Sequence, residues 1–345
     1  MKIFGSKELT QNVIEKDLCI GCGACMDLCP YFASHKGKTA NLFACTLEQG
    51  RCYAYCPKVE TDLEDLSLKI QGTSSDGHAL GHFRSIQISK AGPVAKPGNF
   101  QCGGTVSALM AFGLKKGTLD AAVLTDREGV LPVPKLVTHP DEVYGCSGSK
   151  YTSAPTVSAV HRGIKQGYKK IGMVGTPCQV LASAKMRSNP MNDEVFSDPF
   201  ALVIGLFCTW ALDFRRFEPF ISEIAAAEDI IKIDIPPPPA EIMELHTRHG
   251  KIEIPLEKVR KLVPEACGLC PDMTSEFADI SVGVLEGRPE FNTLIIRSQR
   301  GEEMVHEAVK EGFLVLEAMP EESLDHLILA AGNKKKRASI KETQA

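Results

Sequence analysis

The most constraining feature of this sequence is a run of four cysteines near its start, Cys19-x2-Cys22-x2-Cys25-x3-Cys29, followed directly by Pro30. Three thiolates at intervals of two residues can wrap three corners of one cubane iron–sulfur cluster. The fourth cysteine, which precedes the proline, is directed outward and ligates another cluster. A zinc site is the alternative for such a cysteine set. The spacing therefore predicts at least one 4Fe-4S cluster and a role in electron transfer.

A second cysteine segment, CTLEQGRCYAYCP, follows at residues 45–57. Cys56 precedes a proline, as the last cysteine of the first run does, so it should return to the first cluster. The predicted ligands of the first cluster are Cys19, Cys22, Cys25 and Cys56. The second segment lacks its middle cysteine. The second cluster is therefore predicted on only three cysteines, Cys29, Cys45 and Cys52. Three outcomes stay open here: a residue such as Glu48 completes this cluster, the site holds only three irons, or the cluster is absent.

The cysteine content also indicates the environment of the protein. The 345-residue chain has 13 cysteines, and no apolar signal-peptide segment follows its first residues. We therefore expect a cytoplasmic protein with reduced, metal-binding thiols. The longest apolar run, 200–212, is shorter than the roughly 20 residues of a membrane span and predicts a buried strand leading into a turn. A net charge of −4 and 6% aromatic residues give no sign of a nucleic-acid partner.

Beyond the cysteine segments the pattern of the sequence changes. Residues 1–65 predict a small ferredoxin-like iron–sulfur module whose stability depends on its clusters. Residues 66–98 include a polar, Gly-rich stretch and predict a linker. Helix and strand patterns then alternate, which favours an α/β domain with some parallel pairing over residues 99–332. Residues 333–345 are basic and polar and predict a flexible tail.

Several elements of the α/β domain can be placed from periodicity and from Gly and Pro positions. The predicted helices are 107–117 and 157–167, the predicted strands are 120–125 and 170–175, and 251–256 is a predicted edge strand. Four consecutive prolines at 236–239 predict an extended loop.

The remaining six cysteines are scattered through this domain. Cys178 and Cys208 each follow a strand-like apolar run, so they are expected at one end of a parallel sheet. The CxxC pair at 267–270 is compatible with zinc, a redox disulfide or a cluster. Cys102 and Cys146 are expected to be ordinary thiols.

Five motifs occur in order after Gln101. They are CGGTVSALMAFGL (102–114), GSKYTSAPTVSAV (148–160), VGTPCQV (174–180), CGLCPDMTSEFADISVG (267–283) and NTLIIRSQRGEEMVHEAVKEG (292–312). With this set the chain resembles the coenzyme F420 hydrogenase/dehydrogenase beta-subunit family. The cysteine module in front resembles members that feed a dehydrogenase, such as deazaflavin-oxidising subunits and formate dehydrogenase beta subunits.

The resemblance implies FAD in the α/β domain and a further 4Fe-4S cluster beside it. The implied cluster ligands are Cys178, Cys208, Cys267 and Cys270. The candidate FAD contacts are Gly103, Gly104, Thr105, Lys150, Tyr151, Thr152, Thr176 and Pro177. The glycines would let main-chain N–H groups approach the cofactor closely. Lys150 would favour the anionic reduced flavin, a role that the FAD content and potential of a Lys150→Ala variant test.

The expected function is electron transfer between a hydride carrier and a partner redox enzyme, because FAD converts two-electron into one-electron chemistry. The carrier would be coenzyme F420 or NAD(P)H. The partner would be a catalytic dehydrogenase, hydrogenase or heterodisulfide-reductase-like subunit, with ferredoxin as another exchange partner. Two alternatives are a pure relay without a hydride substrate and a ferredoxin-dependent reductase of an organic substrate.

Overall fold

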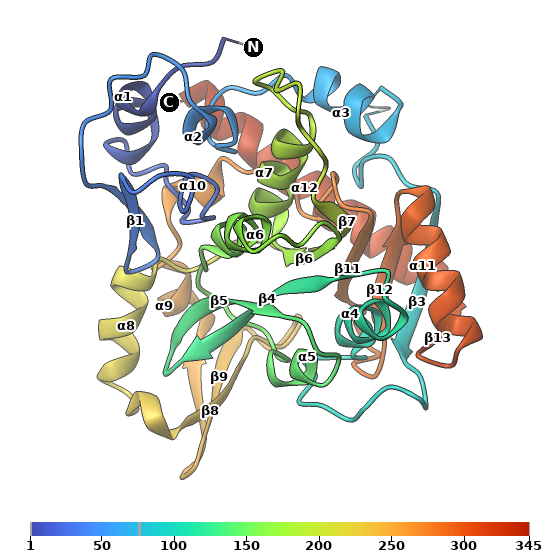
Figure 1. The fold of residues 1–345 in the computed structure, drawn as a ribbon. Coiled ribbons are helices and arrows are strands. Elements are labelled where there is room, and N and C mark those ends of the chain that lie inside the picture. Colours follow the sequence, from blue (N-terminus) through green and yellow to red (C-terminus); the bar gives the residue numbers. More distant parts are fainter. Residues whose placement is uncertain (1, 75–76, 345) are drawn as a thin grey trace.

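An eight-stranded mixed sheet forms the centre of the computed structural model, which describes residues 2–74 and 77–344 (Figure 1). In spatial order its strands are β13 (Leu314–Ala318), β3 (Ser85–Ala91), β12 (Asn292–Ile296), β11 (Ile280–Val284), β7 (Phe200–Leu206), β6 (Ile171–Gly175), β4 (Ala121–Glu128) and β5 (Leu131–Val137). The four neighbours β11, β7, β6 and β4 are parallel, and the other pairs are antiparallel. The expected α/β class with partial parallel pairing is confirmed.

Helices cover both faces of this sheet (Figure 1). They are α4 (Thr105–Lys116) and α11 (Gln299–Lys310) on one face, and α6 (Thr156–Lys165) and α7 (Pro177–Arg187) on the other. Strand β7 shows why two cores form, because Leu202 and Ile204 join the α4 side while Val203 joins the α6 side. The predicted helices and strands between residues 107 and 175 are confirmed with small shifts at their ends.

A three-stranded antiparallel sheet forms a separate layer with its own apolar core. Its strands are β8 (Ile230–Asp234), β9 (Ile242–Thr247) and β10 (Gly250–Pro255), with β10 at an edge as expected. The four prolines lie in the connection between β8 and β9, which has no regular element. Helices α8 (Phe214–Ser222) and α9 (Leu256–Arg260) flank this sheet, and α5 (Glu142–Gly145), α10 (Glu265–Gly268) and the 3-10 turn Ala227–Asp229 complete the domain.

The N-terminal module is built from short elements packed against the α/β domain. They are α1 (Ser6–Leu9), a π-helical turn (Thr10–Ile14), the hairpin β1 (Phe32–His35) and β2 (Lys38–Asn41), and α2 (Arg51–Ala54). Ile20, Cys22 and Ala24 enter the same core as α6 and α7. The main-chain N–H of Val157 donates to the Cys22 carbonyl at 3.0 Å. The module therefore shares its packing with the larger domain.

Two stretches differ from the sequence expectations. Residues 66–98, expected as a linker, contain most of α3 (Leu63–Gln71) and also β3, which lies inside the sheet between β13 and β12. Helix α12 (Glu321–Gln344) runs through the expected flexible tail, because Lys334 and Ala338 are buried. Residues 75–76 of the linker and 345 of the tail lie outside the described residues. None of the helices in residues 2–74 and 77–344 combines the length and the apolar character that a membrane span requires.

Candidate iron–sulfur and cofactor site

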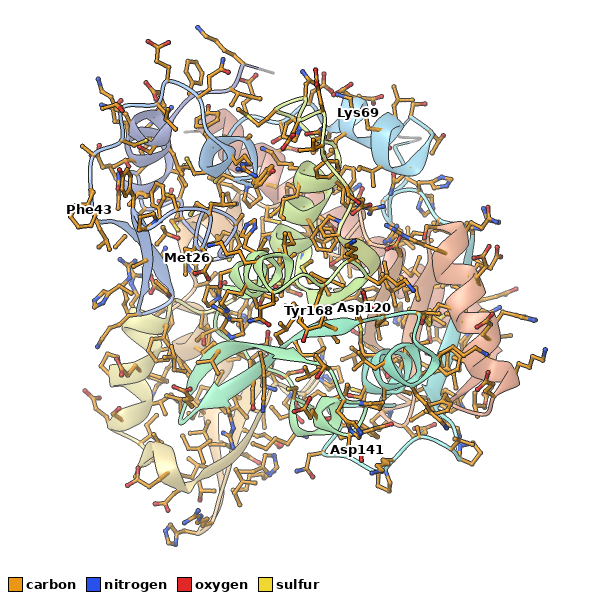
Figure 2. All side chains as sticks on the ribbon, viewed as in Figure 1. Met26, Phe43, Lys69, Asp120, Asp141 and Tyr168 are labelled. Carbon is orange, nitrogen blue, oxygen red and sulfur yellow. The ribbon has the colours of Figure 1, made fainter. Side chains whose placement is uncertain are left out.

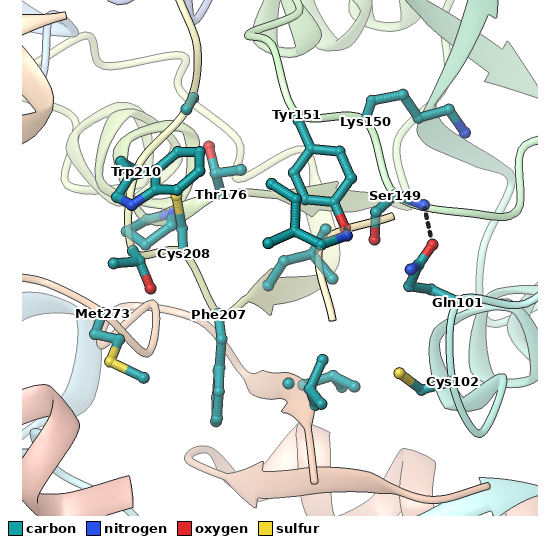
Figure 3. Close-up of a pocket in the computed structure, with 18 of the residues that line it drawn as sticks. Gln101, Cys102, Ser149, Lys150, Tyr151, Thr176, Phe207, Cys208, Trp210 and Met273 are labelled. Atoms are coloured by element: carbon teal, nitrogen blue, oxygen red, sulfur yellow. Dashed lines mark hydrogen bonds between the residues drawn. The ribbon is translucent and has the colours of Figure 1, made fainter. Parts of the chain in front are cut away.

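A cavity of about 980 Å³ opens where the parallel strands of the large sheet end (Figure 3). Gly175, Leu206 and Val284, the last residues of β6, β7 and β11, all line it. Ligands of open α/β sheets bind beyond the carboxyl ends of the strands, which is the position of this cavity. Cofactor sites have volumes of about 300–1,000 Å³, so the cavity is large enough for an extended cofactor.

Two helices begin at the wall of the cavity. Gly104 starts α4 with a φ of +80°, and a Cβ there would lie 2.6 Å from the Phe100 ring. Thr176 caps α7, and its main-chain N–H donates to the Gln179 side chain at 2.8 Å. Both N-termini place partial positive charge beside the cavity, which favours a phosphate-bearing ligand.

The predicted FAD contacts gather at this cavity with one exception. The lining residues among them are Gly104, Thr105, Lys150, Tyr151, Thr152, Thr176 and Pro177. Gly103 is not a lining residue, and a Cβ at this position would lie 2.9 Å from the Ser89 carbonyl oxygen. Its main chain packs closely against β3. The contact of all eight residues with FAD stays a prediction.

Lys150 has a specific local role in the structure. Its Nζ donates to the carbonyls of Cys146, Ser147 and Gly148 at 2.7, 3.1 and 3.0 Å. Figure 3 shows the side chain extending away from Tyr151. Burial lowers the pKa of Lys150. These bonds hold the loop before Tyr151, while an effect of Lys150 on a flavin stays a prediction.

The cysteines form three groups whose members act on one another electrostatically. The first cysteine group is Cys19, Cys22, Cys25 and Cys56, the second is Cys29, Cys45 and Cys52, and the third is Cys178, Cys208, Cys267 and Cys270. Within each group the thiols influence one another's ionisation, as charges in close proximity do. These are the three predicted sets of cluster ligands. Among the described residues, no group of three or more Cys, His, Asp or Glu side chains has the arrangement that would hold a single metal ion.

The third cysteine group forms part of the cavity wall. Cys178 lies in the first turn of α7, Cys208 follows β7, and the CxxC pair surrounds the end of α10. Burial, followed by the neighbouring thiols of the CxxC pair, raises the pKa of Cys178 to about 12. Burial raises the pKa of Cys208 as well. A bound iron–sulfur cluster would hold these sulfurs as thiolates despite their burial.

The three groups form a chain that leads from the cavity to the surface. The first and third groups are neighbours, because Lys58, two residues after Cys56, donates its Nζ to the carbonyl of Ala266, directly before Cys267, at 2.7 Å. Burial, then Cys56 and then Cys178, raises the pKa of Cys22, which agrees with this proximity. Cys52 contributes in the same way to the raised pKa of Cys25, which links the first and second groups. Cys29 of the second group is exposed. The order is therefore cavity, third group, first group, second group and surface.

The second cysteine group has three cysteines in the structure as in the sequence. Burial raises the pKa of Cys52 to about 11, and Cys29 and Cys45 add to this effect. The two cysteines outside the three groups, Cys102 and Cys146, both line the cavity. Glu48 is exposed. For the second group, a non-cysteine ligand, a three-iron site and an absent cluster all stay open.

Comparisons with known proteins identify the family. Residues 94–161 match the model for the N-terminal part of the coenzyme F420 hydrogenase/dehydrogenase beta subunit, and residues 168–322 match the model for its C terminus. The coenzyme F420 hydrogenase subunit beta of Methanococcus voltae is 32% identical over 220 residues, which cover 62% of this chain and 77% of that protein. The chain belongs to the coenzyme F420 hydrogenase/dehydrogenase beta-subunit family. The resemblance seen in the sequence is thereby confirmed.

A domain model, a further relative and a solved structure also match this beta-subunit family member. Residues 12–33 match a 4Fe-4S binding domain, which confirms the iron–sulfur character of the first cysteine run. An F420H2 dehydrogenase subunit of Methanosarcina mazei is 29% identical over 310 residues, covering 84% of this chain and 82% of that protein. A chain of the F420-reducing [NiFe] hydrogenase complex from Methanosarcina barkeri has the same fold, with a TM-score of 0.72 and 22% identity over 79% of this chain and 95% of that chain.

The family member also has cavity residues that sequence reasoning missed. The Ile235 N–H donates to the Tyr151 hydroxyl at 3.0 Å, and this hydroxyl donates to Asp234 at 3.4 Å. The Gln101 side chain donates to Asp234 and accepts from the Ser149 N–H at 3.3 Å (Figure 3). Asp234 lies just before the four prolines, and only the folded chain brings it to the cavity.

Proposed function

We propose that this protein passes electrons between a hydride carrier and a partner redox enzyme through FAD in the cavity and 4Fe-4S clusters on the cysteine groups. The observation that carries the proposal is that the third cysteine group forms part of the cavity wall. A hydride-accepting cofactor in the cavity would lie beside the first of a chain of iron–sulfur clusters. FAD, when bound, accepts two electrons together and releases them singly.

The lining of the cavity fits FAD in three respects. Its volume suits a dinucleotide, the N-termini of α4 and α7 suit a pyrophosphate, and the aromatic rings of Phe207 and Trp210 suit a flat ring system. In this role the helix N-termini bind and orient the phosphates. The aromatic and apolar side chains exclude water from the reacting end.

Gly104 offers a direct test of the FAD position. We expect Gly104→Ala to lower the affinity for FAD at least about tenfold, because its Cβ would displace the Phe100 ring that lines the cavity. Gly117→Ala is the matched control. Gly117 ends the same helix at a φ of +74°, and nothing lies within 4 Å of its added Cβ. Both variants introduce about 1–2 kcal/mol of backbone strain, so equal FAD affinities measured by fluorescence would count against this position.

Coenzyme F420 is the first hydride carrier to consider, because the named relatives are a coenzyme F420 hydrogenase subunit and an F420H2 dehydrogenase subunit. NADH and NADPH are the other carriers. The decisive experiment titrates the anaerobic protein, with FAD and clusters restored, with reduced F420, NADH, NADPH and reduced ferredoxin in turn. We expect one hydride donor to bleach the flavin absorbance within mixing time. A flavin reduced only by ferredoxin would instead favour a relay or a ferredoxin-dependent reductase, and a protein that binds no flavin would refute the proposal.

The surface around the second cysteine group is where we expect the partner to bind. Leu42, Phe43 and Leu47 flank Cys45 and are 52%, 62% and 68% exposed. Figure 2 shows Phe43 at the outer edge of the N-terminal module. Clustered exposed apolar side chains are typical of interaction sites. A partner bound here would approach the outermost cluster without intervening water.

Replacing Phe43 and Leu47 by serine should weaken this contact. We expect the concentration of ferredoxin that gives half-maximal electron exchange to rise at least about tenfold, since buried aromatic anchors contribute most to such interfaces. Reduction of the flavin by the hydride donor should not change. Val195→Ser is the control, because Val195 is 87% exposed and lies outside the N-terminal module. Unchanged exchange with ferredoxin would argue against this surface.

A further inference from the structure

A buried lysine lies beside the first cysteine group. Lys185, on α7, is 2% exposed, and its Nζ donates to the carbonyl oxygen of Cys56 at 2.7 Å and to the Thr61 hydroxyl at 2.9 Å. Cys56 belongs to the N-terminal module, whereas α7 belongs to the α/β domain. The ammonium group is therefore fixed at the boundary between the two, next to a predicted cluster ligand.

A second buried lysine repeats this arrangement at the third cysteine group. Lys334, on α12, is 3% exposed, and its Nζ donates to the carbonyl oxygens of Cys208 and Asp272 at 2.6 and 2.7 Å. Cys208 is a predicted ligand, and Asp272 follows the CxxC pair by two residues. Helices α7 and α12, which are far apart in the sequence, thus each place one ammonium group against the main-chain carbonyl of a predicted cluster ligand.

Neither lysine has a carboxylate partner among the residues that the structure describes. The neighbouring Lys335, by contrast, is partly exposed and pairs with Glu276 at 2.9 Å. Burying an ammonium group without a counter-charge is strongly unfavourable. The groups that act electrostatically on Lys185 are the sulfurs of Cys56 and Cys22, and Lys334 in turn favours the thiolate form of Cys208. An iron–sulfur cluster with four thiolate ligands would supply the missing anion in both places.

We propose that Lys185 and Lys334 are the counter-charges of the first and third clusters, and that each raises the reduction potential of its own cluster. Reduction adds a negative charge to a cluster, and a buried positive charge close by stabilises the reduced form. Net charge and hydrogen bonding around the sulfurs are general determinants of cluster potential. The inference rests on the proposed function, since it requires clusters on these two cysteine groups.

The test uses the full chain with its clusters restored and follows each cluster by EPR during an anaerobic redox titration. Lys185→Met and Lys334→Met keep the length of the side chain and remove its charge. We expect each variant to retain wild-type iron and to lower the potential of one centre, a different centre in each case. The expected shift is at least a tenfold change in the equilibrium constant for reduction, which is about 59 mV for a one-electron couple.

Two lysine variants serve as matched controls. Lys335→Met removes the adjacent charge on α12, which is already paired with Glu276. Lys165→Met removes an exposed lysine of α6 whose Nζ donates to a main-chain carbonyl, that of Asp27, in the N-terminal module. Neither control should shift any potential, because solvent screens an exposed charge and a carboxylate compensates a paired one.

Each other outcome also decides the question. Met variants with wild-type iron and unchanged potentials would overturn the inference. If a Met variant loses its cluster, the corresponding Lys→Arg variant is compared with it. A cluster that is retained with arginine supports a need for the positive charge. A cluster that is lost with both methionine and arginine shows that the lysine acts only sterically, and it overturns the inference. If the unmodified protein itself binds no iron and sulfide, the proposed function fails, and this result is distinct from unchanged potentials.

Discussion

Replacing Cys270 by serine should remove the third cluster and abolish electron transfer from the cavity to an external one-electron acceptor. The third cysteine group lies between the cavity and the first group, because it lines the cavity and because Cys178 neighbours Cys22. No other cysteine group borders the cavity among the described residues. We expect hydride-dependent reduction of ferredoxin to fall to the level seen without the protein, while the hydride donor still reduces the flavin.

The measurements for this variant are its iron content, the rate of flavin bleaching and the rate of ferredoxin reduction. Iron should fall by the content of one cluster, flavin bleaching should continue, and ferredoxin reduction should stop. Cys146→Ser is the matched control, since Cys146 is buried and lines the cavity, but the charged groups that influence it are carboxylates and lysines rather than thiols. A Cys270→Ser protein that reduces ferredoxin at the normal rate would show that electrons leave the cavity by another path.

The cysteine sites differ in how far the sequence alone could predict them. The first run is a local pattern, in which the chain itself fixes the distances between ligands, so spacing was enough to predict a cluster. The third group joins Cys178, Cys208 and the CxxC pair, which lie up to about ninety residues apart. Their meeting depends on β6 and β7 ending side by side, a property of topology. The residues alone left this group open, and only the family resemblance assembled it.

The fold was predictable where periodicity is local. Alternation of helix and strand signals gave the elements between residues 107 and 175, and the alternating pattern at 251–256 gave the edge strand β10. Strand β3 is not predicted, because the polar, Gly-rich stretch before it is typical of a linker. Its partners β12 and β13 lie about two hundred residues later in the chain. Composition could not indicate a pairing across that distance.

The C-terminal segment shows how composition misleads when a charged side chain is buried. Basic, polar residues after 333 predict a flexible tail, because a lysine usually keeps its ammonium group in water. Lys334 instead satisfies its Nζ with two main-chain carbonyls, and Ala338, one turn later, is also buried. The helix thus packs through small and amphipathic residues that carry little apolar signal in the sequence.

Removing residues 333–345 should therefore destabilise the protein and release the third cluster. The truncation deletes both hydrogen bonds of the buried Lys334, and bonds of a charged donor contribute about 1.5–3 kcal/mol each, so we expect a loss of about 3 kcal/mol or more. The denaturation midpoint and the iron content measure the effect. The double variant Lys336→Ala, Arg337→Ala is the control, because it removes two exposed charges and keeps the buried residues. A truncated chain with unchanged midpoint and iron would mean that this helix end is dispensable, as its composition alone suggests.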